Sequence, residues 1–584
     1  MALRGTGTSA APGWRCWLPR VWALALALIL LGPALGAGYV LSFDMVWVPD
    51  LALRSDFLGL ASGLPRAVPS DAVVAVLDEL VPGMVLQKVV LLGCLVAGGI
   101  GAARLAPESS LVGQLVAVSV YEWNPFVAER LLIGHWPVLV GYAVLPWVVV
   151  GARRWRTEAS MPTVLWMLVP LGSLSANSGV ATAAALLAFA LARHRTRANV
   201  TVIALVIAAN APWLVSGLLH ASAATTDPAG AGAFALNRDG ALPGPVAALG
   251  LGGIWNTEVV LPSRDGVLAW LSLVFVLVLA GLGARAWLRR TGRRDVAAFV
   301  ACWVIGYALA VVTWVAPDLT TWLVGHVPGA GLFRDGARAL ALCAPLLVTL
   351  VAQGAAETWE RLPHGVVART SLGAALVVLP ITLMPDAALG LSGRLQPATF
   401  PGAYDQARVV VSDQQRRDGE SAGDLLVLPL SSYRQPQWNH DHKVLDPMGR
   451  FLTPDYVASD RLVVAGEELA GEDPRVIEVS NALAAVTPEA RSRGLADLGI
   501  GVVVVEHDTP GEAPGLAGKV LLDTTQVSVT RIDDPRVRTV PGGWIGGMTL
   551  AWLLYAAAVL VGASSLARSL FCRRRHAGAT AKSV

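Results

Sequence analysis

The sequence predicts a polytopic α-helical membrane protein of about twelve transmembrane helices, with one α/β domain outside the membrane. Of its 584 residues, 54% are hydrophobic and 15% are charged, and the mean hydropathy is +0.56. Such a composition exceeds what the core of a water-soluble protein needs. The net charge is only +3 and the basic residues lie in short clusters beside apolar runs, which argues against nucleic-acid binding.

Candidate spans follow from the apolar runs, because a helix needs about 17–25 apolar residues to cross a bilayer. The runs are residues 21–41, 84–103, 111–121, 137–151, 161–175, 178–192, 199–218, 266–284, 297–316, 339–356, 366–383 and 544–566. Basic clusters occur in every second loop, so the positive-inside rule places both termini in the cytoplasm and the chain in the cytoplasmic (inner) membrane. The first run lacks a convincing cleavage site and is expected to be a retained anchor.

This topology leaves four polar segments and one large domain on the outer face. The polar segments are residues 42–83, 122–136, 219–265 and 317–336. We therefore expect a transmembrane core over 1–383, an extracytoplasmic α/β domain over 384–541, and a final span with a basic cytoplasmic tail over 542–584. Within the domain the patterns predict strands at Asp424–Leu428, Ile500–Glu506, Val520–Leu522 and Val527–Ile532, and a helix at Arg491–Leu498.

Asp44 lies in the loop that directly follows the first apolar run. A partly desolvated carboxylate at the membrane surface, beside aromatic residues, suits a general base for an acceptor hydroxyl. The alternative is an ordinary interfacial loop with solvated Asp residues and one interfacial Trp.

A second group of polar residues lies between the third and fourth runs and contains Arg130 and His135. Arginine is favoured where phosphate oxygens are bound by paired hydrogen bonds, and Trp123 or Trp136 suits stacking on a sugar. An amphipathic interfacial helix with a Trp belt is the alternative.

A third group, Gly329–Arg338, opens a late span from the outer side. Arg334 and Arg338 at a helix N-terminus offer charge and free N–H groups to an anion. Positive charge on this side opposes the positive-inside trend, which disfavours a purely topological role.

Two of these segments resemble a known family. VYEWNPFV over residues 120–127 and LFRDG over 332–336 resemble motifs of the GT-C superfamily of integral membrane glycosyltransferases. They are most similar to the membrane core of actinobacterial α-(1→3)-arabinofuranosyltransferases, which act in cell-wall biogenesis. The resemblance covers residues 20–383 and, loosely, the outer domain.

The resemblance implies transfer of arabinofuranose or mannose from a polyprenyl-phosphate donor to a cell-envelope polysaccharide or glycolipid, with inversion at the phosphate-bearing carbon. Such a reaction needs a base for the acceptor and cations around the departing phosphate. Asp44 is the candidate base. The candidate phosphate ligands are Arg130, His135, Arg334 and Arg338. The candidate sugar and acceptor ligands are Asp50, Glu122, Trp123, Asn124, Trp136, Asp335 and Trp438.

Metal and disulfide chemistry are not required by the sequence. None of the five cysteines lies in the large polar segment, so disulfides and cysteine metal sites are not expected. A divalent cation (Mg, Mn or Ca) is optional, since arginines are able to neutralise the phosphate. The loop from Ser432 to Arg450 gathers polar and aromatic residues that suit glycan stacking: Tyr433, Trp438, Asn439, His440, Asp441 and His442. Two alternatives are a metal held by His440 and His442 with Asp441, and an ordinary interdomain loop that folds back onto the membrane core.

Two other functions remain open from the sequence. One is a non-catalytic GT-C-like scaffold that binds a lipid-linked glycan or a protein partner of unknown identity. The other is a transporter of lipid or sugar, which would need charged or broken helices near the bilayer midplane. Only Lys88 and Arg369 carry charge within the predicted spans, each near a span end, so transport is the weaker alternative.

Overall fold

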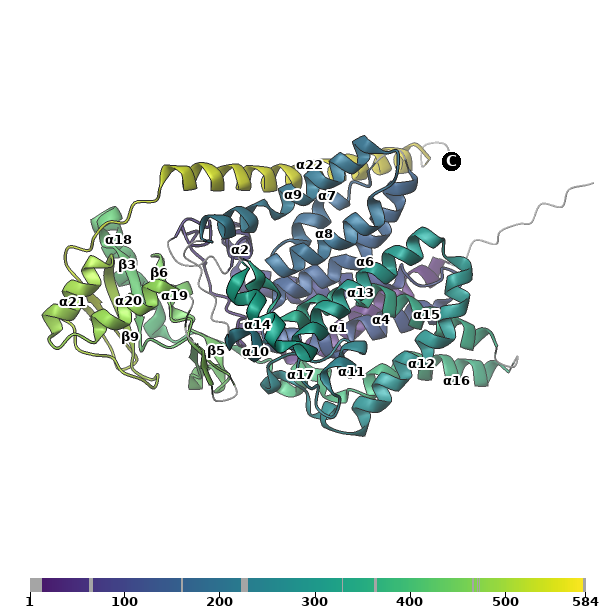
Figure 1. Cartoon of the computed structure of the whole chain (residues 1–584), viewed down its shortest axis with the longest axis horizontal. Coiled ribbons are helices and arrows are strands. Elements are labelled where there is room, and N and C mark those ends of the chain that lie inside the picture. Colours follow the sequence, from purple (N-terminus) through teal and green to yellow (C-terminus); the bar gives the residue numbers. More distant parts are fainter. Residues whose placement is uncertain are drawn as a thin grey trace, which may run out of the picture.

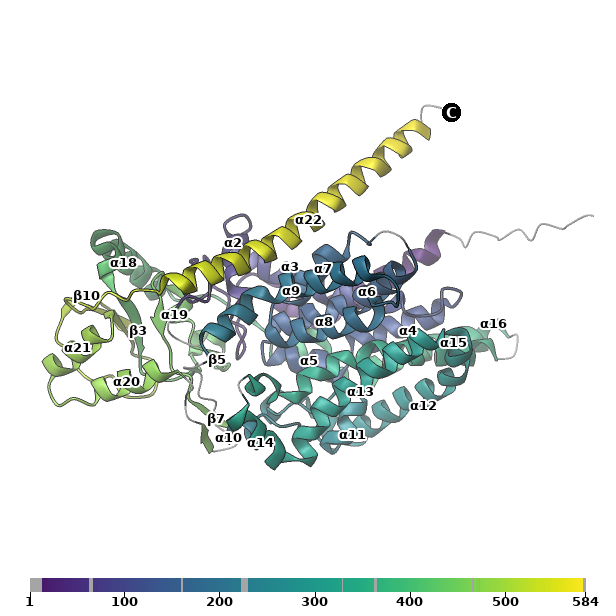
Figure 2. The same ribbon diagram turned by 45° about the horizontal axis from the view of Figure 1, so that its top comes forward.

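The structure is a computed structural model that describes residues 13–580, except 62–66, 159–160, 222–228, 328, 362–364, 465–466, 470 and 472. A large helical part makes up most of the molecule, and an α/β domain lies at one end of its long axis (Figure 1). The last helix, α22, starts beside this domain and runs along α9 and α7 toward the opposite end (Figures 1 and 2).

Seven helices of the described chain are long and apolar enough to cross a membrane. They are α1 with η2 (Leu18–Leu31 and Gly32–Leu35), α3 (Gly83–Ala103), α6 (Trp136–Thr157), α9 (Thr196–Leu219), α12 (Val267–Arg290), α13 (Arg293–Val315) and α22 (Gly542–Thr580). Two bent pairs raise the number to nine if each is one span. The pairs are η6 with α15 (Gly336–Leu342 and Ala344–Glu360) and α16 with η7 and α17 (Val366–Thr382, Pro385–Ala387 and Ala388–Gly393).

The expected number of about twelve spans is therefore not reached by helix length. Three of the apolar runs form the shorter helices α4 (Leu111–Glu122), α7 (Leu165–Gly172) and α8 (Ala176–Ala190). At about 1.5 Å per residue, the 12 residues of α4 extend only about 18 Å, less than the roughly 30 Å of a bilayer core. A polytopic helical membrane protein is confirmed, and the count of twelve is not.

The helical part also contains shorter helices, most of them in the segments between the long ones. They are η1 (Gly13–Cys16), α2 (Ser70–Asp78), α5 (Pro125–Leu132), α10 (Ala229–Ala233), α11 (Gly244–Leu249), η3 (Thr257–Val259), η4 (Pro262–Asp265), α14 (Pro317–His326) and η5 (Ala330–Phe333).

The α/β domain is built on a five-stranded mixed sheet in the order β10-β11-β9-β3-β6. Its strands are β3 (Asp424–Leu428), β6 (Tyr456–Val457), β9 (Ile500–Glu506), β10 (Lys519–Asp523) and β11 (Val527–Arg531). β3 pairs in parallel with β6 and β9, while β11 is antiparallel to both β9 and β10. All four strands that the sequence predicts are present, and the predicted helix is α21 (Pro488–Asp497).

Alternating side chains give the sheet two buried faces, because successive strand residues point to opposite sides. Leu426 and Val503 pack in a cluster with α20 (Pro474–Leu483) and α21. Leu425 and Val502 instead belong to the main core, which α18 (Gly402–Asp418) joins through Ala407 and Val411. The remaining elements are η8 (Gly419–Ala422), η9 (Gln437–Asn439) and α19 (Met448–Phe451), with the strand pairs β1 (Tyr39–Val40) with β2 (Pro397–Ala398), β4 (Tyr433–Arg434) with β5 (Val444–Leu445), and β7 (Leu462–Val464) with β8 (Glu467–Leu469).

The loop that carries β4 and β5 folds back onto the segment that follows α1 in the helical part. The amide N–H of Phe43 donates to the carbonyl of Lys443 at 2.7 Å, and the N–H of Leu445 donates to the carbonyl of Phe43 at 2.8 Å. The side-chain amide of Asn439 donates to the carbonyl of Leu41 at 3.2 Å. The segment after α1 is thereby held against the α/β domain by backbone hydrogen bonds.

Candidate active site

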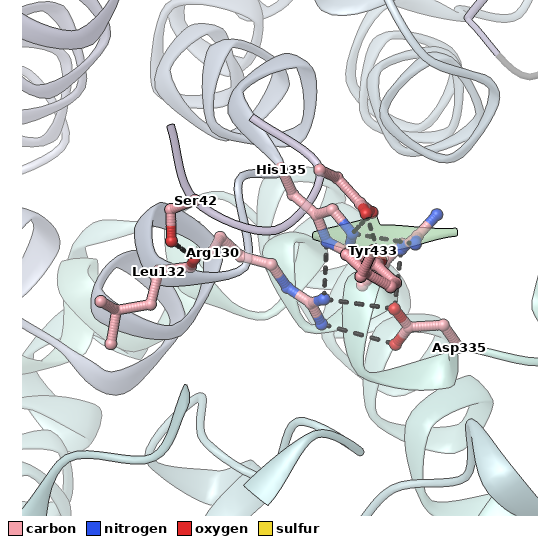
Figure 3. A network of polar contacts seen from close by, with 8 residues as sticks. Ser42, Arg130, Leu132, His135, Asp335 and Tyr433 are labelled. Atoms are coloured by element: carbon pink, nitrogen blue, oxygen red, sulfur yellow. Dashed lines mark hydrogen bonds and ion pairs between the residues drawn. The ribbon is translucent and has the colours of Figure 1, made fainter. Parts of the chain in front are cut away.

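A polar network joins Asp44, Arg130, His135, Asp335 and Arg338 where three distant segments meet. Figure 3 shows the guanidinium of Arg130 between His135 and Asp335. Asp44 follows α1, and Arg130 lies in the last turn of α5 with His135 just after it. Asp335 directly precedes η6, and Arg338 lies within it. The sequence predicts all five as site residues. Asp44 is the predicted base, Arg130, His135 and Arg338 are predicted phosphate ligands, and Asp335 is a predicted sugar or acceptor ligand.

Close backbone contacts fix the position of Asp44. Ser42 Oγ donates to the carbonyl of Leu132 at 2.5 Å (Figure 3), and the N–H of Asp44 donates to the carbonyl of Ile133 at 3.1 Å. Gly134 makes this approach possible. Its φ of +82° lies in the left-handed region, and a Cβ there would stand 2.1 Å from the nitrogen of Met45.

Arg130 lies wholly inside the protein, with a side-chain exposure of 0%. Its Nη1 and Nη2 donate to the two carboxylate oxygens of Asp335 at 3.2 and 3.5 Å, a paired arrangement, and Nη1 also donates to His135 Nδ1 at 3.1 Å. Burial is tolerated because the charge is paired. Arg130 therefore positions Asp335 and His135 and does not present its charge to the surface.

The hydrogen bond from Arg130 also fixes the tautomer of His135. Arginine only donates, so Nδ1 accepts and Nε2 carries the proton. Nε2 donates to Asp44 Oδ2 at 3.1 Å. Burial, together with the charges of Arg338 and Arg130, lowers the pKa of His135 to about 4, so the ring is neutral at physiological pH. His135 is thus an oriented donor to Asp44.

Arg338 is the cation of the network that reaches the surface, with a side-chain exposure of 30%. Its Nε donates to Asp335 Oδ2 at 2.7 Å, and its Nη2 lies 3.3 Å from His135 Nε2. Burial opposes ionisation of Asp335, but Arg130 and Arg338 lower its pKa to about 2. The one N–H of His135 is directed at Asp44, so the partly exposed guanidinium of Arg338 is the group of this network that suits an added oxyanion.

An apolar groove begins at these charged groups. Asp335 and Arg338 line one end, and the walls come from α8 and α13. The remaining lining includes Val180, Ala184, Ile305, Leu309 and Phe333. Its cavity volume is about 50 Å³. The groove combines a cationic end with aliphatic walls.

Tyr433, from the α/β domain, completes the surroundings of Asp44. Its hydroxyl donates to Asp44 Oδ1 at 2.6 Å, and Figure 3 shows it beside His135. Burial disfavours the charged form of Asp44, yet the hydrogen bonds from His135 and Tyr433 and the charge of Arg338 hold its pKa below the ordinary value. The carboxylate remains 40% exposed. This contact could not be predicted from the sequence, because 389 residues separate Tyr433 from Asp44.

Three other predicted site residues lie outside this network in the described chain. The guanidinium of Arg334 lies over the ring of Phe234, 4.5 Å from its centroid. Asp50 is 65% exposed and pairs with Arg408 of α18 at 3.6 Å. Trp438 packs against Phe400 and Tyr404, with ring centroids 5.2 and 5.7 Å apart. Their roles as phosphate, sugar or acceptor ligands stay predictions.

The side chains of the motif at residues 120–127 are buried in the helical part. Asn124 caps α5, accepting from the N–H of Val127 at 3.1 Å, and its amide donates to the carbonyls of Val120 and Tyr121. The indole of Trp123 donates to the carbonyl of Met384 at 2.9 Å.

Two further candidates are also interior. Trp136 packs on Trp47, with ring centroids 5.1 Å apart. Both carboxylate oxygens of Glu122 are buried without a hydrogen-bond partner in the described chain. The roles of Glu122, Trp123, Asn124 and Trp136 as sugar or acceptor ligands stay predictions.

Metal binding has little support from the described residues, among which no three His, Cys, Asp or Glu side chains come close enough to hold an ion. The ring centroids of His440 and His442 are 6.0 Å apart. Asp44 and Asp335 already accept from Tyr433, His135 and the arginines. The described residues of the site therefore do not fit a divalent cation.

Comparison with known proteins identifies the fold. No family model matches the sequence, and no curated protein matches it. Among solved structures, the chain is similar to the arabinofuranosyltransferase AftD from Mycobacteria, with a TM-score of 0.54 and 15% identity over 90% of this chain and 40% of AftD. The chain therefore shares the fold of this arabinofuranosyltransferase, as the resemblance of the motifs implies.

A mutant of AftD gives a TM-score of 0.51 and 16% identity, covering 90% of this chain and 42% of the other. The chain thus spans about two fifths of the length of AftD. At this identity the likeness establishes the fold alone.

Proposed function

We propose that this protein is a membrane glycosyltransferase that moves a sugar from a polyprenyl-phosphate donor to a cell-envelope glycan or glycolipid on the outer face. One observation carries the proposal: Asp44, an accessible carboxylate oriented by His135 and Tyr433, lies beside the partly exposed Arg338. A base and a cation stand next to each other, as glycosyl transfer from a phosphate requires. Arabinofuranose and mannose are the sugars we propose.

Asp44 acts as the base in the proposed reaction. It accepts the proton of the acceptor hydroxyl while the oxygen of that hydroxyl bonds to C1 of the sugar. The bond from C1 to the phosphate oxygen breaks at the same time, and its electron pair leaves with the phosphate. Attack from the face opposite the phosphate inverts C1, through an oxocarbenium-like state. The lowered pKa keeps Asp44 ionised and ready to accept at neutral pH.

Arg338 stabilises the departing phosphate, and Arg334 is retained as a second candidate. Charge-assisted hydrogen bonds from arginine are about twice as strong as neutral ones. Arg130 does not contact the phosphate in this proposal, because its guanidinium is engaged by Asp335 and His135. It positions these two residues instead. The apolar groove between α8 and α13 then receives the first part of the polyprenyl chain.

The test is transfer by the purified full chain in lipid nanodiscs. Radiolabelled decaprenyl-phosphoryl arabinose or polyprenyl-phosphoryl mannose is supplied with short arabinan or mannan acceptors, and the product is analysed for anomeric configuration. We expect a product with inverted configuration at C1. Donor binding without transfer to any acceptor would contradict the proposal and favour the scaffold instead.

A further inference from the structure

A second groove lies far from Asp44, at the end of the helical part opposite the α/β domain. Its walls come from the first turns of α1 and α4, the end of α15 and much of α16, and its volume is about 820 Å³. Figure 1 shows α4, α15 and α16 toward this end. Ligand sites typically measure about 300–1,000 Å³, so the groove is large enough to hold part of a lipid.

The lining of the groove changes from polar to apolar along its length. Arg15, Ser109, Glu360, Arg369 and Thr370 lie near the helix ends. The deeper walls come from α1 and α16 and include Val21, Trp22, Ala25, Val377 and Val378. Arg369 and Val378 are nine positions apart on one helix, which spans about 13 Å at 1.5 Å per residue. The change from a polar end to apolar walls suits an amphiphile whose headgroup lies at the end of the helical part.

Arg369 is the best candidate for the headgroup contact. Its guanidinium lies over the ring of Trp359, 5.0 Å from the centroid, which limits its movement. Its Nε is buried and has no hydrogen-bond partner in the described part of the chain. Arg15 and Arg369 together outweigh Glu360 by one positive charge, so the polar end suits one phosphate diester.

The apolar side of the groove is reached from the lipid phase. Val21 of α1 is 58% exposed, and Val378 of α16 is 40% exposed. In a membrane such side chains face lipid, so an acyl chain can enter sideways between the two helices. A soluble anion would gain nothing from these walls.

We propose that this groove binds one anionic phospholipid, with its phosphate at Arg369 and Arg15 and an acyl chain between α1 and α16. Basic pockets between transmembrane helices are known to hold anionic headgroups. The site is separate from the proposed donor site, because it lies at the opposite ends of α1 and α15 from Asp44 and Arg338. It does not depend on the proposed activity.

The test compares phosphatidylglycerol with phosphatidylcholine of the same acyl chains, added to the delipidated full chain. Lipid binding is measured by native mass spectrometry and by the rise in Tm. Both lipids carry the phosphate, but the choline cation of phosphatidylcholine is repelled by the two arginines, so we expect the wild type to prefer phosphatidylglycerol by about tenfold. Arg369→Gln should abolish most of this preference, and Arg369→Lys should keep part of it.

Two further variants separate charge from shape. Arg361→Gln is the matched control, because this neighbouring arginine is 65% exposed and pairs with Glu357. Its preference should equal that of the wild type. Ala374→Trp fills the groove from an exposed position of α16 without changing charge, and should weaken binding of both lipids.

Three results would overturn the proposal. They are equal binding of the two lipids by the wild type, an undiminished preference in Arg369→Gln, and displacement of phosphatidylglycerol by inorganic phosphate alone. The last result would assign a site for a free anion.

Discussion

Arg130 in the helical part and Arg434 in the α/β domain are both buried, and each stands beside a residue that donates to Asp44. Arg434 has all three nitrogens engaged: Nε with Glu506 at 2.7 Å, Nη1 with a carbonyl of its own loop, and Nη2 with Asp446 at 2.9 Å. Arg130 leaves its buried Nε without a partner in the described chain. Its partner Asp335 is shared with Arg338, which reaches the surface.

The difference shows how the two parts divide their tasks. The network of Arg434 is closed, so it fixes the loop that carries Tyr433. The network of Arg130 opens toward the outside through Arg338 and His135. We therefore expect changes at Arg434 to appear first in stability, and changes around Arg130 to appear first in donor binding and catalysis.

The largest expected loss of stability comes from Arg434→Gln. Removing one partner of a buried ion pair leaves uncompensated charge and costs about 3–5 kcal/mol. Thermal unfolding of the purified protein, followed by a probe in the α/β domain, measures this loss. Arg416→Gln is the control, because its exposed pair with Asp413 on α18 is worth about 0–1 kcal/mol. Equal losses in the two variants would contradict a structural role for the Arg434 network.

A smaller effect is expected for the cations near the proposed phosphate. Arg338→Gln should weaken binding of a polyprenyl-phosphate sugar by about tenfold to a hundredfold, the size of a contact of roughly 1.5–3 kcal/mol. If Arg334 holds the same phosphate, the losses in the double variant should be non-additive. If Arg338→Gln binds the donor with unchanged affinity, the donor phosphate does not lie at Arg338.

The mildest change is Tyr433→Phe, which removes one donor from Asp44 and leaves the ring. Because the hydroxyl helps to hold the pKa of Asp44 below its ordinary value, its loss should raise that pKa. Asp44 is then protonated at a higher pH, so the acid limb of the pH–activity profile should move upward while donor affinity stays the same. A profile identical to that of the wild type would mean that the hydroxyl does not act on the base.

The sequence predicts most residues of the candidate site, and the structure brings five of them together, but their contacts could not be predicted. Asp44, His135, Asp335 and Arg338 were recognised because charge beside apolar runs is unusual. The structural role of Asn124 also had a local signal, since Asn followed by Pro is typical of a helix start. Tyr433 stands out in the sequence only as part of a polar aromatic loop, because its contact with Asp44 depends on how the α/β domain docks.

The same contrast holds for the fold. The strand β9 was predicted at its observed bounds because a run of β-branched residues in a soluble domain has few other interpretations. The short apolar run of α7 gave a span on hydropathy alone, but a break at Ser173 ends the helix after eight residues. Where a helix ends depends on packing and capping that hydropathy does not report.

The most direct test of the central claim is the turnover of Asp44→Asn in nanodiscs, measured beside donor binding. The substitution keeps the shape of the side chain and removes its basicity, so donor affinity should stay near that of the wild type. Turnover should fall by about 10²–10⁴-fold. Asp50→Asn is the matched control and should be mild, since Asp50 lies at the exposed pair with Arg408. Full activity of Asp44→Asn would contradict the account of this site.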